Sequence, residues 1–222
     1  PIREAIKKSK VGDGNGLKGI LAQRALQALE AKLNEEGKTL KNMRGLKTTA
    51  VDRYTMAKAM ADSGLDMTYG DLRFALGIPI SIHSLASVRL LAAILMPVVS
   101  RVPYSWLYPT GEKQIAPPEN KYPKLYENAD VIGGDFLQIR AYLPPDLTGK
   151  IIVTNTTTAE NVEMLQKRNL KMLVTSTPRY EGRSFGTNVM EATLRALIDK
   201  PDNEITSEDM LALVEKIPLE PN

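Results

Sequence analysis

Glycines near the start of the chain have the spacing of a phosphate-binding turn. The segment VGDGNGLKG (11–19) contains the pattern G-x-G-x-x-G at Gly14, Gly16 and Gly19, and a long amphipathic stretch follows it directly. Glycines let the main chain approach a diphosphate, whose charge is stabilised by free N–H groups and by the positive end of a helix dipole. These glycines, with Asn15, are therefore candidates for cofactor binding. The alternative is a glycine-rich start of a helix, because the preceding residues, KKSKVG, suit an apolar strand poorly.

An acid–base pair follows the next predicted strand. Asp52 and Arg53 come after LKTTAV (46–51), and the predicted helix YTMAKAMADSG (54–64) follows them. At the end of the second strand of a dinucleotide fold, such a pair would lie beside the adenosine ribose. There the guanidinium can contact a 2′-phosphate and stack on adenine. The alternative is a solvated pair that caps the helix.

Polar side chains also follow the later strands. Asp71 follows TYG, Asp135 follows VIGG, and Asn155 and Thr156 follow KIIVT. Carboxylate, amide and hydroxyl groups at several strand ends suit a phosphate, ribose or polyol. Each of them alone is also a common helix cap.

Proton transfer needs a group whose pKa lies near the working pH. Lys113, in YPTGEKQ, is the candidate if burial lowers its pKa, with Glu112 or Asp135 as its partner. The alternative for Lys113 is an exposed turn. We take Lys113 and Asp135 as the catalytic candidates.

The last candidate site is the stretch PRYEGRSFGTNVMEA (178–192). Arg183 and Ser184 precede a helix that we expect to begin near Gly186, and Asn188 lies in its first turn. A guanidinium and the N–H groups of a helix N-terminus suit a substrate carboxylate or phosphate. An exposed charged loop is the alternative.

Strands and helices alternate along the chain and must position these residues. Short apolar or β-branched runs predict strands near residues 46, 66, 130, 150 and 171, with a weaker candidate at 10–12. Most of the segments between these strands have apolar residues with the 3.6-residue periodicity of helices. Strands that are apolar on both faces predict a doubly wound α/β domain over 1–222, with a mostly parallel sheet and Rossmann-like architecture. The segment 102–128, rich in Pro, Tyr, Lys and Glu, predicts an irregular lid or excursion.

Composition excludes several classes of protein. The 222 residues are 43% hydrophobic and 25% charged, which is ordinary for a globular chain, and a dispersed net charge of +3 does not favour nucleic acid. The absence of cysteine excludes disulfides and thiolate nucleophiles, and the single histidine, His83, excludes His-based metal sites and a Ser-His-Asp triad. The longest apolar run, LLAAILMPVV (90–99), is too short to span a bilayer and predicts a buried helix. We expect a cytoplasmic protein with no metal.

Six segments carry a resemblance that extends over nearly the whole chain. They are DGNGLKG, YGDLRFALGIPI, WLYPTGEKQ, ADVIGGD, TNTTTAENVEML and GRSFGTNVMEA. Together they resemble a family of bacterial proteins labelled quinate 5-dehydrogenase or shikimate dehydrogenase-like. The stretch after residue 51 is also similar to the NADP-binding turn of shikimate and quinate dehydrogenases, Asn-Arg-Thr followed by a helix with Lys-Ala. Arg53 matches the Arg, Lys58 and Ala59 match the helix, and Asp52 replaces the Asn, which leaves NAD or NADP open.

The resemblance implies an NAD(P)-dependent oxidoreductase that transfers a hydride to or from a quinate- or shikimate-like hydroxy acid or polyol. True shikimate dehydrogenases use a Lys and an Asp supplied mainly by a separate substrate domain, and their Lys-bearing motif has no counterpart here. The related proteins carry an additional N-terminal segment, so we expect an upstream domain to be missing.

Two other functions stay open: a non-catalytic nucleotide-binding or regulatory protein, and a nucleotide- or sugar-phosphate-dependent transferase on the same fold. As partners we expect a small-molecule hydroxy-acid substrate, no nucleic acid and no membrane, with a homodimer as the assembly to consider.

Overall fold

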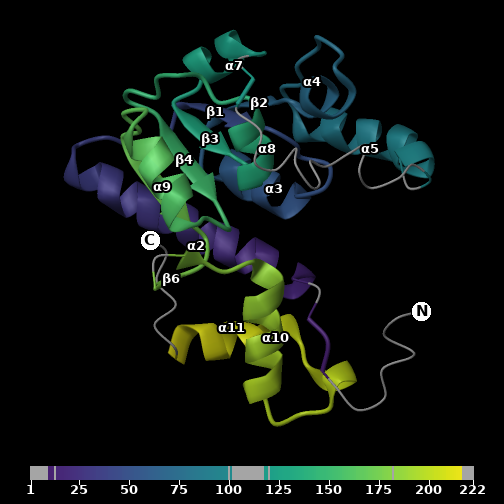
Figure 1. Ribbon diagram of the computed structural model, residues 1–222. Helices are drawn as coiled ribbons and strands as arrows, with labels where there is room; N and C mark the ends of the chain where they lie inside the picture. Colours follow the sequence, from purple (N-terminus) through teal and green to yellow (C-terminus); the bar gives the residue numbers. More distant parts are fainter. Residues whose placement is uncertain are drawn as a thin grey trace.

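Five short parallel strands form the central sheet (Figure 1). The computed structural model describes residues 10–12, 14–99, 101, 118–119, 121–181 and 183–216. All five main predicted strands are confirmed, whereas residues 10–12 form no strand. The strands are β1 (Arg44–Lys47), β2 (Asp66–Tyr69), β3 (Val131–Gly133), β4 (Ile151–Thr154) and β5 (Met172–Thr175).

The strand order is β2-β1-β3-β4-β5, which confirms the doubly wound α/β fold. The chain passes from β1 to the edge strand β2 on one side, and then crosses back to β3 on the other side of β1. The direction of winding therefore reverses between β1 and β3. In open α/β sheets, ligands bind at this switch point, beyond the carboxyl ends of the strands.

Helices cover both faces of the sheet. On one face α2 (Asn15–Glu35) and α3 (Tyr54–Asp62) share a hydrophobic core with the strands. On the other face a second core contains side chains of α7 (Pro123–Asn128), α8 (Phe136–Ala141) and α9 (Ala159–Gln166). The remaining described elements are α4 (Asp71–Leu76), α5 (Leu85–Val99), the hairpin β6–β7 (Arg179–Tyr180, Arg183–Ser184), α10 (Thr187–Leu197), η2 (Asp202–Glu204) and α11 (Ser207–Lys216).

The long helix α2 contributes to two cores. Its second half, with Ala25, Leu29 and Leu33, packs on the sheet. Its first half, with Leu17 and Leu21, packs on α10 and α11. Helix α2 consequently lies between the sheet and the pair α10–α11 (Figure 1).

The predicted buried helix at 90–99 needs correction, and most of the predicted irregular segment 102–128 lies outside the described residues. The apolar run 90–99 was expected to be buried, but in α5 Leu90 is 63% and Ile94 is 62% exposed, and among the described side chains of that helix Val88 is the one buried in the core. Within the expected irregular segment 102–128, α7 forms at its end, whereas residues 102–117 lie outside the described part. None of the described helices combines the length and apolar character that crossing a membrane requires.

Candidate functional site

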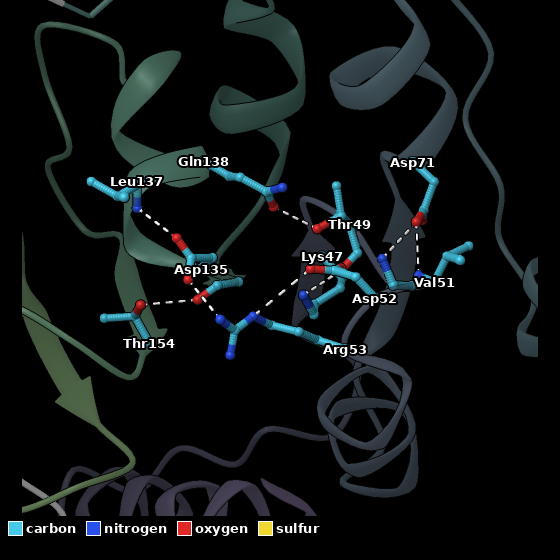
Figure 2. A network of polar contacts seen from close by, with 12 residues as sticks. Lys47, Thr49, Val51, Asp52, Arg53, Asp71, Asp135, Leu137, Gln138 and Thr154 are labelled. Carbon is cyan, nitrogen blue, oxygen red and sulfur yellow. Dashed lines mark hydrogen bonds and ion pairs between the residues drawn. The ribbon is translucent and has the colours of Figure 1, made fainter. Parts of the chain in front are cut away.

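A network of polar side chains lies at the switch point between β1 and β3 (Figure 2). Its members come from the end of β1, the loop 48–53, the start of α4 and the segment after β3. We call it the switch-point network, and it consists of Lys47, Thr49, Asp52, Arg53, Asp71, Asp135 and Gln138.

Lys47 is the last residue of β1, and its side chain is fully buried, with 0% exposed. Its Nζ donates a hydrogen bond to the backbone carbonyl of Thr49. Burial in the low-dielectric interior disfavours the ammonium and lowers the pKa of Lys47 from 10.5 to about 8, although the nearby carboxylate of Asp52 acts in the opposite direction. The amine is therefore able to take up and release a proton near neutral pH.

Arg53 joins the two strand ends across the switch point. Its Nη2 donates to Oδ2 of Asp135 at 2.6 Å, and its Nε lies 4.0 Å from Oδ2 of Asp52. Asp135 is the N-cap of α8, since its Oδ1 accepts a hydrogen bond from the N–H of Leu137 at 3.0 Å. Arg53 thus lies between two carboxylates, directly before the first turn of α3 (Figure 2).

Asp71, the first residue of α4, holds the loop 48–53 through hydrogen bonds to its backbone. Its Oδ1 accepts hydrogen bonds from the N–H groups of Ala50 at 2.7 Å and Val51 at 2.9 Å. The residue is only 4% exposed, and burial raises the pKa of its carboxyl group above the ordinary value, against the effect of the two N–H donors. Oδ2 of Asp71 and Oγ1 of Thr48 are buried and have no hydrogen-bond partner among the described residues.

The predicted glycine turn packs against the C-terminal helices. Gly14, in the left-handed conformation (φ 79°), is the N-cap of α2. A Cβ on Gly14 would lie 2.3 Å from Oδ1 of Asn188, and the N–H of Gly16 donates to Oε2 of Glu191 at 3.0 Å. A carboxylate of the chain therefore already occupies the place where a helix N-terminus binds an anion.

The placement of the glycine turn relative to the strands differs from the prediction. Residues 10–12, before the glycine turn, form no strand, and the Asp52–Arg53 pair follows β1, which is the first strand of the described residues, rather than the second. The two groups are nevertheless close, because a Cβ on Gly19 would lie 3.7 Å from the side chain of Thr55 in α3.

The other predicted residues form a separate cluster after β4. Ser184 is buried, and its Oγ donates to the carbonyl of Asn155 at 2.8 Å while it accepts from the N–H of Thr157 at 2.9 Å. Oδ1 of Asn155 is buried and lacks a hydrogen-bond partner in the described part of the chain. Thr156 lies beside Gly186, and Arg183 is exposed.

The structure brings some of the predicted site residues together, separates others, and adds residues that the sequence did not single out. The structure unites Asp52, Arg53 and Asp135, whereas Asn188 lies beside Gly14, the N-cap of α2. Asn15 is the first residue of α2, and Lys113 falls outside the described residues. Lys47 was missed, although a single lysine inside the predicted strand LKTTAV (46–51) is a usable signal, since lysine is seldom fully buried. Gln138, whose Oε1 accepts from Oγ1 of Thr49, was missed because glutamine within a helix carries no such signal.

No three His, Asp or Glu side chains of the described residues gather closely enough to hold a metal ion.

Comparison with known proteins adds a family. Neither a curated protein nor a solved structure matches the sequence. Residues 16–222, which include the whole switch-point network, match the model of a family described as a domain of unknown function, DUF8754. The chain belongs to the DUF8754 family.

Proposed function

We propose that this chain is an NAD(P)-dependent oxidoreductase that acts on a hydroxy acid or polyol of the quinate or shikimate type. The observation that carries the proposal is Lys47, a fully buried amine with a pKa lowered to about 8 at the carboxyl end of the inner strand β1. Oxidation of an alcohol needs a base for the hydroxyl proton, and the reverse reaction needs an acid. A group that titrates near the working pH serves in both directions.

The proton route would use two members of the switch-point network. Lys47 has no exposed surface, so it would store the proton rather than contact the substrate. The side chain of Asp52 is about one-third exposed, and its charge acts on Lys47. Asp52 would thus connect the substrate side with the buried amine. NAD(P), when bound, would accept or supply the hydride.

Arg53 and the start of α3 would hold the cofactor diphosphate. In dinucleotide folds the diphosphate lies at the turn after the central first strand, at the N-terminus of the helix that follows. In this chain that turn is the loop 48–53, which has no glycine but places the Arg53 guanidinium there. A diphosphate would compete with Asp135 for Arg53. Asn155, with its unpaired Oδ1 after β4, would then face the nicotinamide end of the cofactor.

The binding part is tested by isothermal titration calorimetry with NAD⁺, NADH, NADP⁺ and NADPH. We expect at least one of them to bind, and Arg53→Gln to weaken that binding about ten-fold or more, because a charge-assisted bond to phosphate is lost. The control is Lys41→Gln, which removes an exposed charge before β1, at the other end of the strand. Absence of binding at millimolar concentration of all four nucleotides would refute the proposal.

The catalytic part is tested with Lys47→Met and Lys47→Arg, in a screen of hydroxy acids and polyols that follows nicotinamide absorbance. Methionine cannot carry a proton, and arginine cannot release one. We expect both variants to bind the nucleotide and to lose turnover. Turnover at the rate of the unmodified protein in both variants would exclude Lys47 from the reaction.

We further propose a cytoplasmic setting, with the hydroxy acid as a diffusing small molecule.

A second candidate is a non-catalytic nucleotide-binding or regulatory protein. It is favoured by the fact that Lys47 and Arg53 both have partners within the chain, the Thr49 carbonyl and Asp135. Internally satisfied charges stabilise a loop without taking part in a reaction. This candidate is preferred if a nicotinamide nucleotide binds and no substrate in the screen is turned over.

A further inference from the structure

A cavity of about 370 Å³ lies on the side of the sheet away from Lys47. It extends along β1 and β2, beside α7, and the side chains of Leu46 and Thr68 line it. Successive side chains of a strand point to opposite faces, so Lys47 points toward the α3 face instead. The volume is within the range of pockets that bind small molecules. The cavity is therefore a second place for a ligand, separate from the switch-point network.

Two cationic side chains line this cavity without a counter-ion among the described residues. Arg73, in α4, donates from Nε to Oγ of Ser81 at 3.2 Å, which fixes the plane of the guanidinium. Its terminal nitrogens have no partner in the described ranges, and neither does the amino group of the exposed Lys124, in α7. A planar guanidinium with free terminal donors suits two oxygen atoms of a carboxylate or phosphate.

The other polar groups of the lining complete a binding site for an oxyanion. His83 lies with Nδ1 3.4 Å from Oγ1 of Thr68, which leaves Nε2 for a ligand. Arg44 is already neutralised by two bonds to Asp130, at 3.0 and 3.2 Å. Asp66 is the acidic side chain of the lining, at the start of β2. Hydroxyl and imidazole donors beside two unpaired cations favour an anion over a neutral or cationic ligand.

We infer that this cavity binds a small anionic metabolite through a carboxylate or phosphate group. Arg73 and Lys124 bind the oxyanion, and Ser81 and His83 lie where they can donate further hydrogen bonds. The inference does not depend on NAD(P) binding, because no member of the switch-point network lines the cavity.

His83 provides a direct assay, because it is the only histidine of the 222 residues. Its imidazole signals are therefore unambiguous in a ¹H–¹⁵N NMR spectrum. The probes are inorganic phosphate and malonate, each titrated at constant pH and constant ionic strength, with sodium chloride as the balancing salt. We expect a saturable shift of the His83 signals with at least one probe in the millimolar range. A response to phosphate alone or to malonate alone supports the inference and identifies the group that is bound.

Two variants test the assigned cations. Arg73→Gln and Lys124→Gln should each weaken the binding of the responding probe about ten-fold or more, because each removes a charge-assisted hydrogen bond. Lys124 is exposed, so Lys124→Gln leaves the fold intact even if Arg73→Gln does not. The control is Lys167→Gln, on the surface of α9, which should bind as the unmodified protein does. The inference is overturned if neither probe gives a saturable shift, or if Lys124→Gln binds with unchanged affinity.

Discussion

Replacing Lys47 by methionine should make the protein more stable at neutral pH. The ammonium is fully buried, and its pKa is about 8 instead of 10.5. One pKa unit corresponds to about 1.4 kcal/mol, so keeping the charge in the interior costs about 3 kcal/mol at neutral pH. Methionine has a similar length and no charge, but it loses the hydrogen bond to Thr49 and the attraction to Asp52. We therefore expect a net gain of about 1–3 kcal/mol in the free energy of unfolding.

The gain should depend on pH with a defined sign. In the folded protein Lys47 loses its proton near pH 8, and in the unfolded chain near 10.5. Between these values the unfolded state binds more protons, so stability rises with pH; below pH 8 both states are protonated and the full cost remains. From about pH 7 to about pH 9.5 this one group should add about 2 kcal/mol to the stability of the unmodified protein. Tyr69, whose pKa burial raises to about 12, acts in the opposite direction only above its ordinary value of 10.0.

Urea unfolding of the unmodified protein and of Lys47→Met, at a series of pH values, measures this difference. We expect the advantage of the variant to shrink as pH rises toward about 9.5, by about 2 kcal/mol. Lys58→Met is the control, because Lys58 is exposed in an ion pair with Asp62, and it should change stability by less than about 1 kcal/mol. The reasoning is refuted if Lys47→Met is less stable than the unmodified protein by the same amount at every pH. The neighbouring carboxylates would then more than offset the burial of the ammonium, and Lys47 would not be a proton acceptor near neutral pH.

Two substitutions test how the surrounding loops are held. Asp71→Ala removes the acceptor of the buried N–H of Ala50 and of the half-buried N–H of Val51, so it should lower the free energy of unfolding by about 2 kcal/mol in urea titrations. Stability equal to that of the unmodified protein would mean that water replaces the carboxylate. Gly12→Ala would place a Cβ 2.6 Å from the backbone N of Ala192 in α10, whereas Gly149→Ala has a left-handed backbone (φ 76°) and no described atom within 4 Å of the new Cβ. Gly149→Ala should cost about 1 kcal/mol and Gly12→Ala clearly more, because helix backbone cannot move aside as a side chain can; equal losses in thermal unfolding would contradict the close packing of Gly12 on α10.

Local signals in the sequence were sufficient for the strands and most helices. The strands β3, β4 and β5 are short apolar or β-branched runs, and the stripe from Leu17 to Leu33 has helical spacing along its whole length. Such patterns predict elements well because strand and helix periodicity depend on neighbours within a few residues. The same signals could not predict the burial of α5, since an apolar run indicates a helix but does not show whether another part of the chain packs on it. Leu90 and Ile94 lie in this run and are exposed.

The glycine segment shows where a local motif is insufficient. The spacing of Gly14, Gly16 and Gly19 permits close approach, but it does not say what approaches. In the fold the partners are Asn188 and Glu191, more than 170 positions further along the chain. Whether the N–H groups of a helix start meet a ligand or a carboxylate of the chain is decided by how distant helices pack.

The sequence by itself determined that a strand with a lysine lies near residue 46, that an acid–base pair comes after it, and that polar residues follow the later strands. Only the tertiary structure decided that this lysine is buried among Asp52, Asp71 and Asp135. A pKa depends on desolvation and on charges in three dimensions, and those charges come from strands that the winding order brings to one edge of the sheet. No local pattern contains that information.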